Sequence, residues 1–590
     1  MNESINKKIN GIIGKLTIED KIGQLMTMNH TGCGFTSFEK KYINKFRCGG
    51  LRITPHIIAD VFDGSDTFLY RKLAPYAGPE ELAKVLRRLQ EMALERNGIP
   101  LHLVTDQEGD LSIDVIRGGV HLFPSSMGIA ATGDLDLAYR SALSIAKQLR
   151  AQGINWMHSP EVDVNIQPEN PEVGMRAFSD DPKTCADFGI AMMRGFLDGG
   201  VMPTAKHFPG RGDSVTDAHD QLDVSKKSLE ELKACELLPY REMIKNGSYF
   251  SVMTAHQGFT ALDPSNTPAS LSFKMTTELL RNEMGFKGVI TTDAIGMHGA
   301  IDFAGSTPAA VLMALQAGAD LVLMKNPEHE SEKTFNLVMQ AVKDKKLLEK
   351  DIDEKIKRIL EAKFRLGLFD ENFLPAPEKA MEPIRDVKIK NTCEEVFRKG
   401  SLITRDKTGL LPLSKDKKIL VVEQYISLYH EKGNDVHYHS GMFSEFMREI
   451  GSPENIISLE TMTPPNHDDE RRLFERLDKV EIVVFSNIFW RGSGSNRELI
   501  RKVIEKGKKV IVTTNDLYDS HFIPSAGTVI CTFGAVPQGQ KTAAEIIFGK
   551  VKPGGKWPLK VIQMDKPVSN DKVVSHKIAG HFAKEKSPGK

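Results

Sequence analysis

The chain has 590 residues, more than one hydrophobic core usually serves, so two or three domains are expected. Hydrophobic residues make up 40% of the chain and charged residues 26%, the proportions of an ordinary globular protein. Lysine plus arginine and aspartate plus glutamate both number 78, a balance that argues against a nucleic-acid-binding or membrane-surface protein.

The cysteines and the first residues of the chain indicate the compartment in which the protein is expected. Six cysteines are scattered without CxxC pairs, so neither a disulfide framework nor a zinc site is expected. The first residues have no apolar segment typical of a signal peptide, and no apolar run is long enough to cross a bilayer. A cytoplasmic, reducing location is therefore expected for the chain as written.

Short apolar strands alternate with helical patterns in the first half of the chain. Helices are predicted at positions such as 79–97 and 135–152. Alternation over about 250 residues is typical of a (β/α)8 barrel, although a doubly wound open sheet has similar spacing. Seven strands are predicted, at 49–53, 101–105, 154–157, 202–206, 250–254, 288–292 and 319–323.

The second half shows another α/β pattern after a helical segment at 344–366 and a proline-containing stretch at 372–383. A helix at 386–400 leads to predicted strands at 418–422, 481–485, 509–513 and 529–533. Continuous apolar strands indicate a mainly parallel sheet covered on both faces. We predict an α/β protein with a TIM-like catalytic barrel at 1–370, a linker at 371–395, an α/β sandwich domain at 396–575 and a tail at 576–590.

One strand end carries cationic and hydrogen-bonding side chains. Lys206 and His207 end an apolar run and precede a turn that contains Pro209 and Gly210. Asp217 and His219 follow, and this spacing lets a carboxylate orient an imidazole and adjust its pKa. Such a pair can also be a surface accident, but its position behind this strand end favours an active site.

A second strand end carries an acid. Asp293 follows the predicted strand 288–292, and in a parallel barrel this position opens into the pocket at the carboxyl ends of the strands. The alternative is that Asp293 caps the next helix, a common role of aspartate after a strand.

Together these segments resemble glycoside hydrolase family 3, and within it the branch of bacterial β-N-acetylglucosaminidases. The resemblance runs in order along nearly the whole chain. It rests on residues 15–25, 105–109, 176–182, 206–213, 217–219, 285–293, 409–413 and 548–558.

The resemblance implies an exo-acting, retaining β-N-acetylhexosaminidase that hydrolyses terminal β-linked N-acetylglucosamine through a covalent glycosyl-enzyme. It assigns Asp293 as the nucleophile, His219 as the acid/base and Asp217 as the partner of the imidazole. The resemblance, and not the spacing, selects a histidine over a second carboxylate as acid/base. No metal or organic cofactor is expected, and the expected partner is a small oligosaccharide or glycoside.

Four further residues are expected to bind the terminal sugar. Arg176 can instead be a structural salt-bridge partner and His207 a core histidine, and Glu108 can be structural or functional. His256 and Met297 also stand at strand ends but can be ordinary packing residues. The predicted substrate-binding residues are Asp106, Arg176, Lys206 and His207.

The chain departs from the family pattern near the first sugar-binding strand end. Asp110 replaces a glycine, Asp114 stands near the place of an arginine that contacts the sugar, and Arg211 replaces a histidine in the turn. Three alternatives therefore stay open: a β-glycosidase for another sugar, such as a β-glucosidase, a β-N-acetylglucosaminide phosphorylase and a non-catalytic sugar-binding protein. Phosphorolysis is included because a neutral imidazole repels phosphate less than a carboxylate does.

The loop 490–495 is either a lid over the pocket or a plain surface loop, and the oligomeric state is open.

Overall fold

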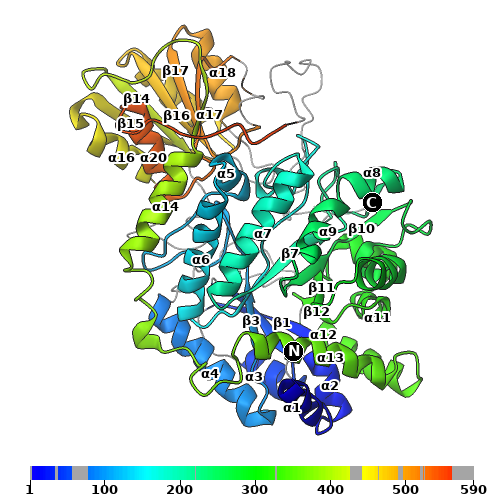
Figure 1. The fold of residues 1–590 in the computed structure, drawn as a ribbon. Helices are drawn as coiled ribbons and strands as arrows, with labels where there is room; N and C mark the ends of the chain where they lie inside the picture. Colours follow the sequence, from blue (N-terminus) through cyan, green and yellow to red (C-terminus); the bar gives the residue numbers. More distant parts are fainter. Residues whose placement is uncertain are drawn as a thin grey trace, which may run out of the picture.

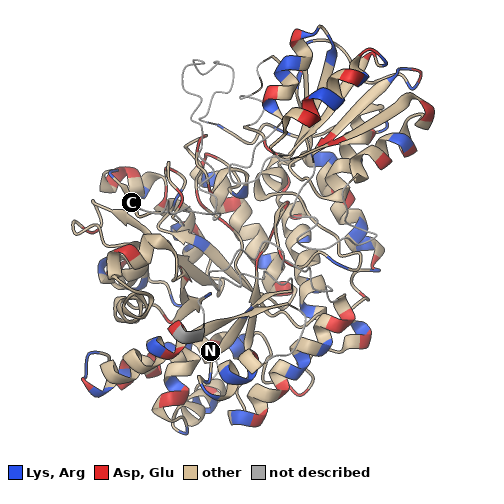
Figure 2. Cartoon of the chain, turned by 180° about the vertical axis from the view of Figure 1, so that it is seen from behind, with Lys and Arg blue, Asp and Glu red and all other residues tan. Residues whose placement is uncertain are grey.

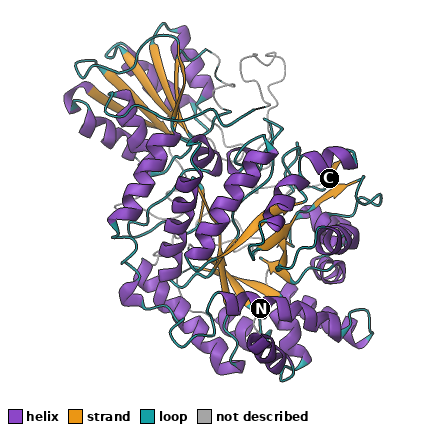
Figure 3. Cartoon of the chain, in the orientation of Figure 1, coloured by secondary structure: helices purple, strands orange, loops and turns teal. Residues whose placement is uncertain are grey.

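The computed structural model describes residues 3–32, 37–55, 78–218, 221–325, 328–424, 441–462, 464–488, 496–518, 523 and 525–560. They form two parts, a barrel and a smaller sheet with helices on both sides (Figure 1). Figure 3 shows the strands of each part enclosed by helices.

Within the described residues, eight parallel strands close into the barrel, in the order β1-β12-β11-β9-β7-β6-β3-β2. Each strand pairs in parallel with the next, for example Thr27 beside Gly50 and Thr291 beside Leu321, with register shifts in the β11–β12 and β7–β9 pairs. All eight carboxyl ends therefore open at one mouth. The strands are β1 (Met26–Thr31), β2 (Gly50–Thr54), β3 (His102–Thr105), β6 (Trp156–Met157), β7 (Met202–Phe208), β9 (Ser251–Thr254), β11 (Ile290–Ala294) and β12 (Leu321–Met324).

Two short sheets lie beyond the strand ends. The first pairs β4 (Gln107–Gly109) with β5 (Ser112–Ile113), and the second pairs β8 (Asp223–Ser225) with β10 (Gln257–Phe259). Both lie in segments that follow carboxyl ends of barrel strands, so they shape the mouth.

Amphipathic helices surround the barrel, and their ends carry recognisable signals. In α4, Pro79 opens the helix, Gly98 ends it in the left-handed conformation, and Leu82, Leu86 and Leu89 are buried on one face. The helices of this part are α1 (Glu3–Ile13), α2 (Ile18–Gln24), α3 (Ser37–Asn44), α4 (Pro79–Asn97), α5 (Ser126–Ala131), α6 (Leu135–Ala151), α7 (Pro182–Asp198), α8 (Leu229–Ala234), α9 (Leu237–Lys245), the π-helix η4 (Lys274–Glu283), α10 (His298–Ala304), α11 (Thr307–Ala317), α12 (Glu328–Lys343) and α13 (Glu349–Arg365).

The predicted α/β class and barrel are confirmed, and closure of the sheet excludes the doubly wound alternative. Of the eight barrel strands, the sequence prediction missed one, β1, whose sequence Met-Thr-Met-Asn-His-Thr is polar at its end and contains no β-branched apolar run. Its pairing with both β12 and β2 closes the barrel.

In the second part, six strands of the described residues form one sheet in the order β13-β18-β17-β16-β14-β15, with β13 antiparallel to β18 and all other pairs parallel. Alternate residues enter different cores: Leu420 and Val422 pack on one face, and Ile419 and Val421 pack on the other. The sheet is therefore covered on both faces, as predicted. The elements are β13 (Leu402–Asp406), β14 (Ile419–Gln424), β15 (Ile456–Thr461), β16 (Ile482–Asn487), β17 (Lys509–Thr514), β18 (Thr528–Cys531), α14 (Val387–Gly400), α16 (Met442–Ile450), α17 (His467–Leu477), α18 (Arg497–Glu505) and α20 (Pro537–Ile547).

The two parts make direct polar and apolar contacts. Asp110, beyond the end of β3, accepts hydrogen bonds from Asn515 Nδ2 at 2.7 Å and from the Ala535 backbone amide at 2.6 Å. Asn165 Nδ2 donates to the Tyr518 hydroxyl at 2.8 Å. Since Asn515 follows β17, the carboxyl ends of the second sheet lie against the mouth of the barrel.

Acidic and basic residues are interspersed over the outer helices of both parts (Figure 2). Among the helices that the structure describes, none is both long and apolar enough to cross a bilayer. The predicted loop at 490–495 and the predicted tail at 576–590 lie outside the described residues.

Candidate active site

The end of β7 places His207 between two carboxylates. His207 Nδ1 lies 2.8 Å from Asp163 Oδ2, and His207 Nε2 lies 3.7 Å from Asp293 Oδ2. Asp163 also accepts the backbone amides of His207 at 3.2 Å and Arg211 at 2.7 Å. Asp163 therefore fixes the ring, so that Nε2 faces Asp293.

Asp293 lies in β11 at the mouth, with 14% of its side chain exposed. Burial raises the pKa of this carboxyl, but the charges of His207 and His256 outweigh burial and hold the pKa well below its ordinary range. Asp293 is consequently anionic at neutral pH. It does not cap the next helix, because the residue before α10 is Met297.

The Asp217 segment lies against the same strand end. Ala218 is buried in a small apolar cluster with Ala294, the residue after Asp293. The Ala218 carbonyl accepts the Gly299 amide at 3.0 Å, which ties the segment to the start of α10. Thus the residue after Asp217 and the residue after Asp293 belong to one apolar cluster. His219 lies outside the described residues.

Three of the four predicted sugar-binding residues, Asp106, Arg176 and Lys206, form one charged network around the end of β3. Lys206 Nζ lies 2.5 Å from Glu108 Oε1 and 3.3 Å from Asp106 Oδ1. Arg176 Nε lies 2.8 Å from Glu108 Oε2. Burial raises the pKa of Glu108, but Arg176 and Lys206 outweigh it and lower this pKa to about 2. Glu108 thus anchors two predicted sugar-binding cations.

Arg176 is held deeply by protein groups. Its Nη2 lies 2.7 Å from Glu161 Oε2 and 3.0 Å from Glu108 Oε1, and its Nη1 donates to the Glu172 carbonyl at 3.0 Å. These contacts match the structural salt-bridge reading of Arg176. Its contact with a sugar stays a prediction.

His256 and Met297 form part of the wall next to Asp293. His256 Nδ1 lies 2.7 Å from Ser270 Oγ, and Nε2 lies 3.0 Å from the Ala294 carbonyl. Met297 belongs to the cluster that holds Ala218. Both side chains support the strand end, which agrees with the packing interpretation.

Sequence reasoning missed three charged residues of the site. Asp163 lies in the segment after β6, which runs beside β7. Arg52 lies in β2 and contacts Asp106, and Lys325 directly follows β12 with its charge acting on Asp106 and Asp293. The same strand-end rule that selected Asp293 identifies Lys325, whereas the place of Arg52 depends on barrel register and that of Asp163 on how the chain folds after a two-residue strand.

One group of side chains offers metal-ligand atoms. Glu161, Asp163 and His207 each present an oxygen or nitrogen, all within 4.8 Å of one another. Asp163 and His207 already bond to each other, and Glu161 lies against Arg176. Burial raises the pKa of Glu161 well above its ordinary range, which disfavours the charged form that a cation needs. These contacts fit hydrogen bonding better than ion binding.

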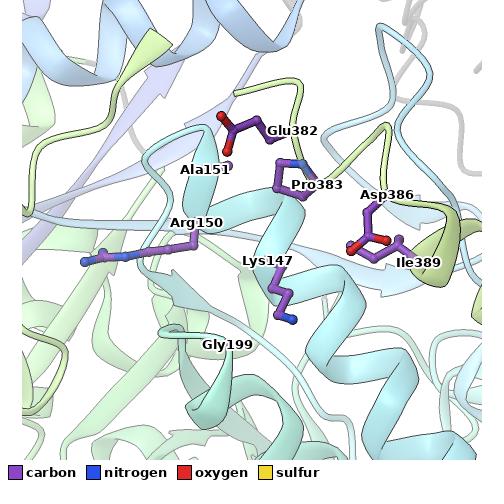
Figure 4. Close-up of a pocket in the computed structure, with 8 residues that line it drawn as sticks. All are labelled: Lys147, Arg150, Ala151, Gly199, Glu382, Pro383, Asp386 and Ile389. Atoms are coloured by element: carbon purple, nitrogen blue, oxygen red, sulfur yellow. The ribbon is translucent and has the colours of Figure 1, made fainter. Parts of the chain in front are cut away.

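A cavity of about 430 Å³ lies elsewhere, between the last turn of α6 and the segment 382–389 (Figure 4). Arg150 and Gly199, which line it, precede the amino ends of β6 and β7. The cavity is therefore at the opposite end of the barrel from Asp293, and none of the predicted site residues lines it.

Parallel barrels carry their catalytic groups at the carboxyl ends of their strands, which is where Asp293 and the charged network around Asp106 lie. Residues 17–362 match the model of the glycosyl hydrolase family 3 N-terminal domain, which covers the whole barrel. The chain belongs to glycoside hydrolase family 3, as the sequence resemblance predicted.

Three proteins similar to this chain carry different enzyme names. β-Hexosaminidase A of Pseudoalteromonas piscicida is 32% identical over 307 residues, 48% of this chain and 51% of that protein, so the match spans about half of that relative. A β-N-acetylglucosaminidase/β-glucosidase of Cellulomonas fimi is 26% identical over 78% of this chain and 84% of its own length. The solved structure of a family 3 β-N-acetylglucosaminidase from Paenibacillus sp. FPU-7 superposes with a TM-score of 0.79 at 27% identity, covering 92% of this chain and 99% of that one.

Proposed function

We propose that this glycosidase is an exo-acting, retaining β-N-acetylhexosaminidase that releases terminal β-linked N-acetylglucosamine. Asp293 is the nucleophile, His219 the acid/base and Asp217 the carboxylate that orients His219. Asp106, Arg176, Lys206 and His207 bind the terminal sugar.

The observation that carries this proposal is the environment of Asp293. Its carboxylate is anionic, sits at the mouth of the barrel and faces His207 Nε2 at 3.7 Å. Ala218, the residue after Asp217, belongs to the same buried apolar cluster as Ala294, the residue after Asp293, which supports placing the acid/base segment beside this carboxylate. A retaining glycosidase needs these two groups on either side of one anomeric carbon.

The chemistry proceeds in two balanced steps. Asp293 forms a bond to the anomeric carbon as the bond to the leaving oxygen breaks, and the imidazolium of His219 gives its proton to that oxygen. Water then attacks the glycosyl ester, His219 takes the water proton, and Asp293 leaves as the carboxylate. Two inversions give net retention of the β configuration.

The names of the relatives support an N-acetylglucosamine substrate but also leave a glucoside as the second candidate. The Cellulomonas fimi relative carries both activities in its name. In this chain Asp114 occupies the place near which the family pattern has an arginine, and this departure favours testing both sugars.

The test is a comparison of p-nitrophenyl β-N-acetylglucosaminide with p-nitrophenyl β-glucoside, each with and without inorganic phosphate. The proposal expects the larger kcat/KM for the N-acetylglucosaminide and release of the free sugar when phosphate is present. Preference for the glucoside contradicts the sugar assignment, formation of a sugar 1-phosphate contradicts hydrolysis, and inactivity on every aryl glycoside contradicts the enzyme assignment.

A further inference from the structure

The guanidinium of Arg52 lies behind Asp106. Arg52 is in β2 with 5% of its side chain exposed, and its Nη2 lies 2.5 Å from Asp106 Oδ2 and 2.7 Å from Asp114 Oδ2. Its Nη1 donates to the Ile53 carbonyl at 2.6 Å and to Thr54 Oγ1 at 2.8 Å. Both terminal nitrogens are therefore engaged within the protein, and the fork is held in one orientation.

Asp114 links this arginine to the backbone of the strand end. The same oxygen that contacts Arg52 accepts the Asp106 backbone amide at 2.9 Å and Thr105 Oγ1 at 3.0 Å. In addition, the Asp114 amide donates to the Asp106 carbonyl at 3.0 Å. One carboxylate thus fixes both the main chain at Asp106 and the guanidinium that contacts the Asp106 side chain.

Of the Arg52, Asp106 and Asp114 side chains, that of Asp106 is the most exposed. Its side chain is 24% exposed, compared with 10% for Asp114 and 5% for Arg52. Although burial raises the pKa of Asp106, the charges of Arg52 and Lys206 hold it well below the ordinary range. Asp106 is therefore an anionic hydrogen-bond acceptor that reaches the mouth while Arg52 and Asp114 stay behind it.

We propose that Arg52 and Asp114 are a pair of positioning residues that fix Asp106 for the hydroxyl groups of the terminal sugar. Where the family pattern has an arginine that donates to the sugar, this chain uses a buried arginine to aim a carboxylate acceptor. The substrate class that follows is a terminal sugar with unsubstituted hydroxyls at the positions facing Asp106. This inference rests on the proposed function, because it assumes that a sugar occupies the mouth.

The test uses Arg52→Met, Arg52→Lys, Asp114→Asn and the Arg52→Met/Asp114→Asn double variant of the full chain. The substrate is the aryl glycoside that the wild type hydrolyses best, together with its monodeoxy analogues. In Arg52→Met and Asp114→Asn, Asp106 is no longer held in place, so its charged hydrogen bond to the sugar hydroxyl is weakened. We expect KM to rise about tenfold or more while kcat stays within about threefold of wild type. Arg52→Lys retains the positive charge but lacks the two-nitrogen fork, so its KM should rise less than that of Arg52→Met. The double variant is expected to resemble Arg52→Met alone.

The deoxy analogues give the readout that a purely structural role does not change. Wild type discriminates against the analogue that lacks a hydroxyl bound by Asp106, and Asp106→Asn identifies which hydroxyl that is. The Arg52 and Asp114 variants should lose the same discrimination.

A matched control lies at the other end of the barrel. Asp320 accepts the Ile290 amide at 2.8 Å and Arg281 Nη2 at 2.8 Å, so a carboxylate there also joins a backbone amide to an arginine. Arg281→Met and Asp320→Asn should lower the thermal midpoint while leaving KM and hydroxyl discrimination at wild-type values.

Unchanged KM and unchanged discrimination in folded Arg52→Met would overturn the inference while leaving the proposed function intact. If Arg52→Met does not fold, Arg52→Lys and Asp114→Asn decide by the same readouts. A wild type that hydrolyses no aryl glycoside overturns the proposed function itself.

Discussion

At the scale of single residues, the charge state of Asp293 depends on the imidazole beside it. His207 Nε2 lies 3.7 Å away, and Asp163 orients the ring from the other side. The Asp293 side chain is 14% exposed, and an anionic carboxylate with little water around it suits the nucleophilic role that we propose for it.

Replacing Asp293 with Asn should lower kcat/KM by about a thousandfold or more, because an amide cannot form the glycosyl ester. Asn has nearly the same shape, so the thermal midpoint should stay close to that of the wild type. Steady-state kinetics on the preferred aryl glycoside and a thermal melt measure both effects. A variant with more than a tenth of wild-type activity would show that another residue is the nucleophile.

The pH profile should depend on His207. Because its charge lowers the pKa of Asp293, the acid limb of kcat/KM in the wild type is expected below the ordinary aspartate pKa of about 3.9. In His207→Gln the pKa of Asp293 rises, so the acid limb should move to higher pH by about one unit or more. An acid limb that stays in place contradicts the coupling of these two groups.

The candidate residues that could be predicted from the sequence are those that stand directly at strand ends. Asp293, Lys206 and His207 follow recognisable apolar runs, and the structure brings them together at one mouth. The sequence did not identify Asp163 as the partner of His207, because Asp163 is six residues beyond the two-residue strand β6. Neither did it show that Arg52 occupies the space behind Asp106, since contacts between neighbouring strands depend on barrel register.

At the scale of elements, the segment from β7 to Asp217 is rooted by a close backbone contact. A Cβ atom on Gly212 would lie 1.6 Å from the Val164 carbonyl oxygen, and the Gly212 carbonyl accepts the Gln167 amide at 3.1 Å. Only glycine fits this contact, so Gly212 sets where the segment leaves the barrel.

Gly212→Ala should destabilise the fold by about 1–3 kcal/mol and displace the segment. A displacement of about 1 Å at the acid/base would lower kcat by up to about a hundredfold. Gly11→Ala is the control, because a Cβ there meets nothing within 4 Å and alanine stabilises a helix by about 0.5–1 kcal/mol. Chemical denaturation and kinetics compare the two, and equal behaviour would contradict the role given to Gly212.

Elements with strong apolar runs were predicted well, and those without were missed. Strands β14 and β16 each begin with four continuous apolar residues, and α4 has clear signals at both ends. In the missed strands β1, β13 and β15, polar residues interrupt or end the apolar run. β13 and β15 are the two edges of the second sheet, where one side lacks a neighbouring strand and burial is lower.

At the scale of the whole molecule, Asp110 joins the barrel to the second part. It accepts from Asn515 and Ala535, and burial raises its pKa to about 7 even though these hydrogen bonds lower it. The family pattern has a glycine here, so the departure seen in the sequence becomes a contact between the two parts.

The stability of the chain should therefore contain a pH-dependent contribution from Asp110. The pKa of Asp110 is higher in the folded chain than in the unfolded chain. Its contribution to the free energy of unfolding is therefore fully present below the unfolded pKa and is lost as the pH rises through about 7. A shift of about three units corresponds to at most about 4 kcal/mol. Thermal melts between about pH 5 and 8.5 should show a fall for the wild type that is absent in Asp110→Asn.

Asn515→Ala provides the second variant of this test. Asn515 lowers the pKa of Asp110, so its removal should move the fall in stability to higher pH. Identical pH dependence in the wild type and both variants would contradict the assignment of this contribution to Asp110.

The measurement that tests the central claim most directly is the identification of the glycosylated residue. A fluorinated glycoside that forms the covalent intermediate faster than it hydrolyses is incubated with the protein, and the digested chain is analysed by mass spectrometry. The prediction is one added sugar on the peptide that contains Asp293, and no added sugar in Asp293→Asn. A label on another carboxylate such as Asp106, or steady turnover of unmodified glycoside by Asp293→Asn, would contradict the claim.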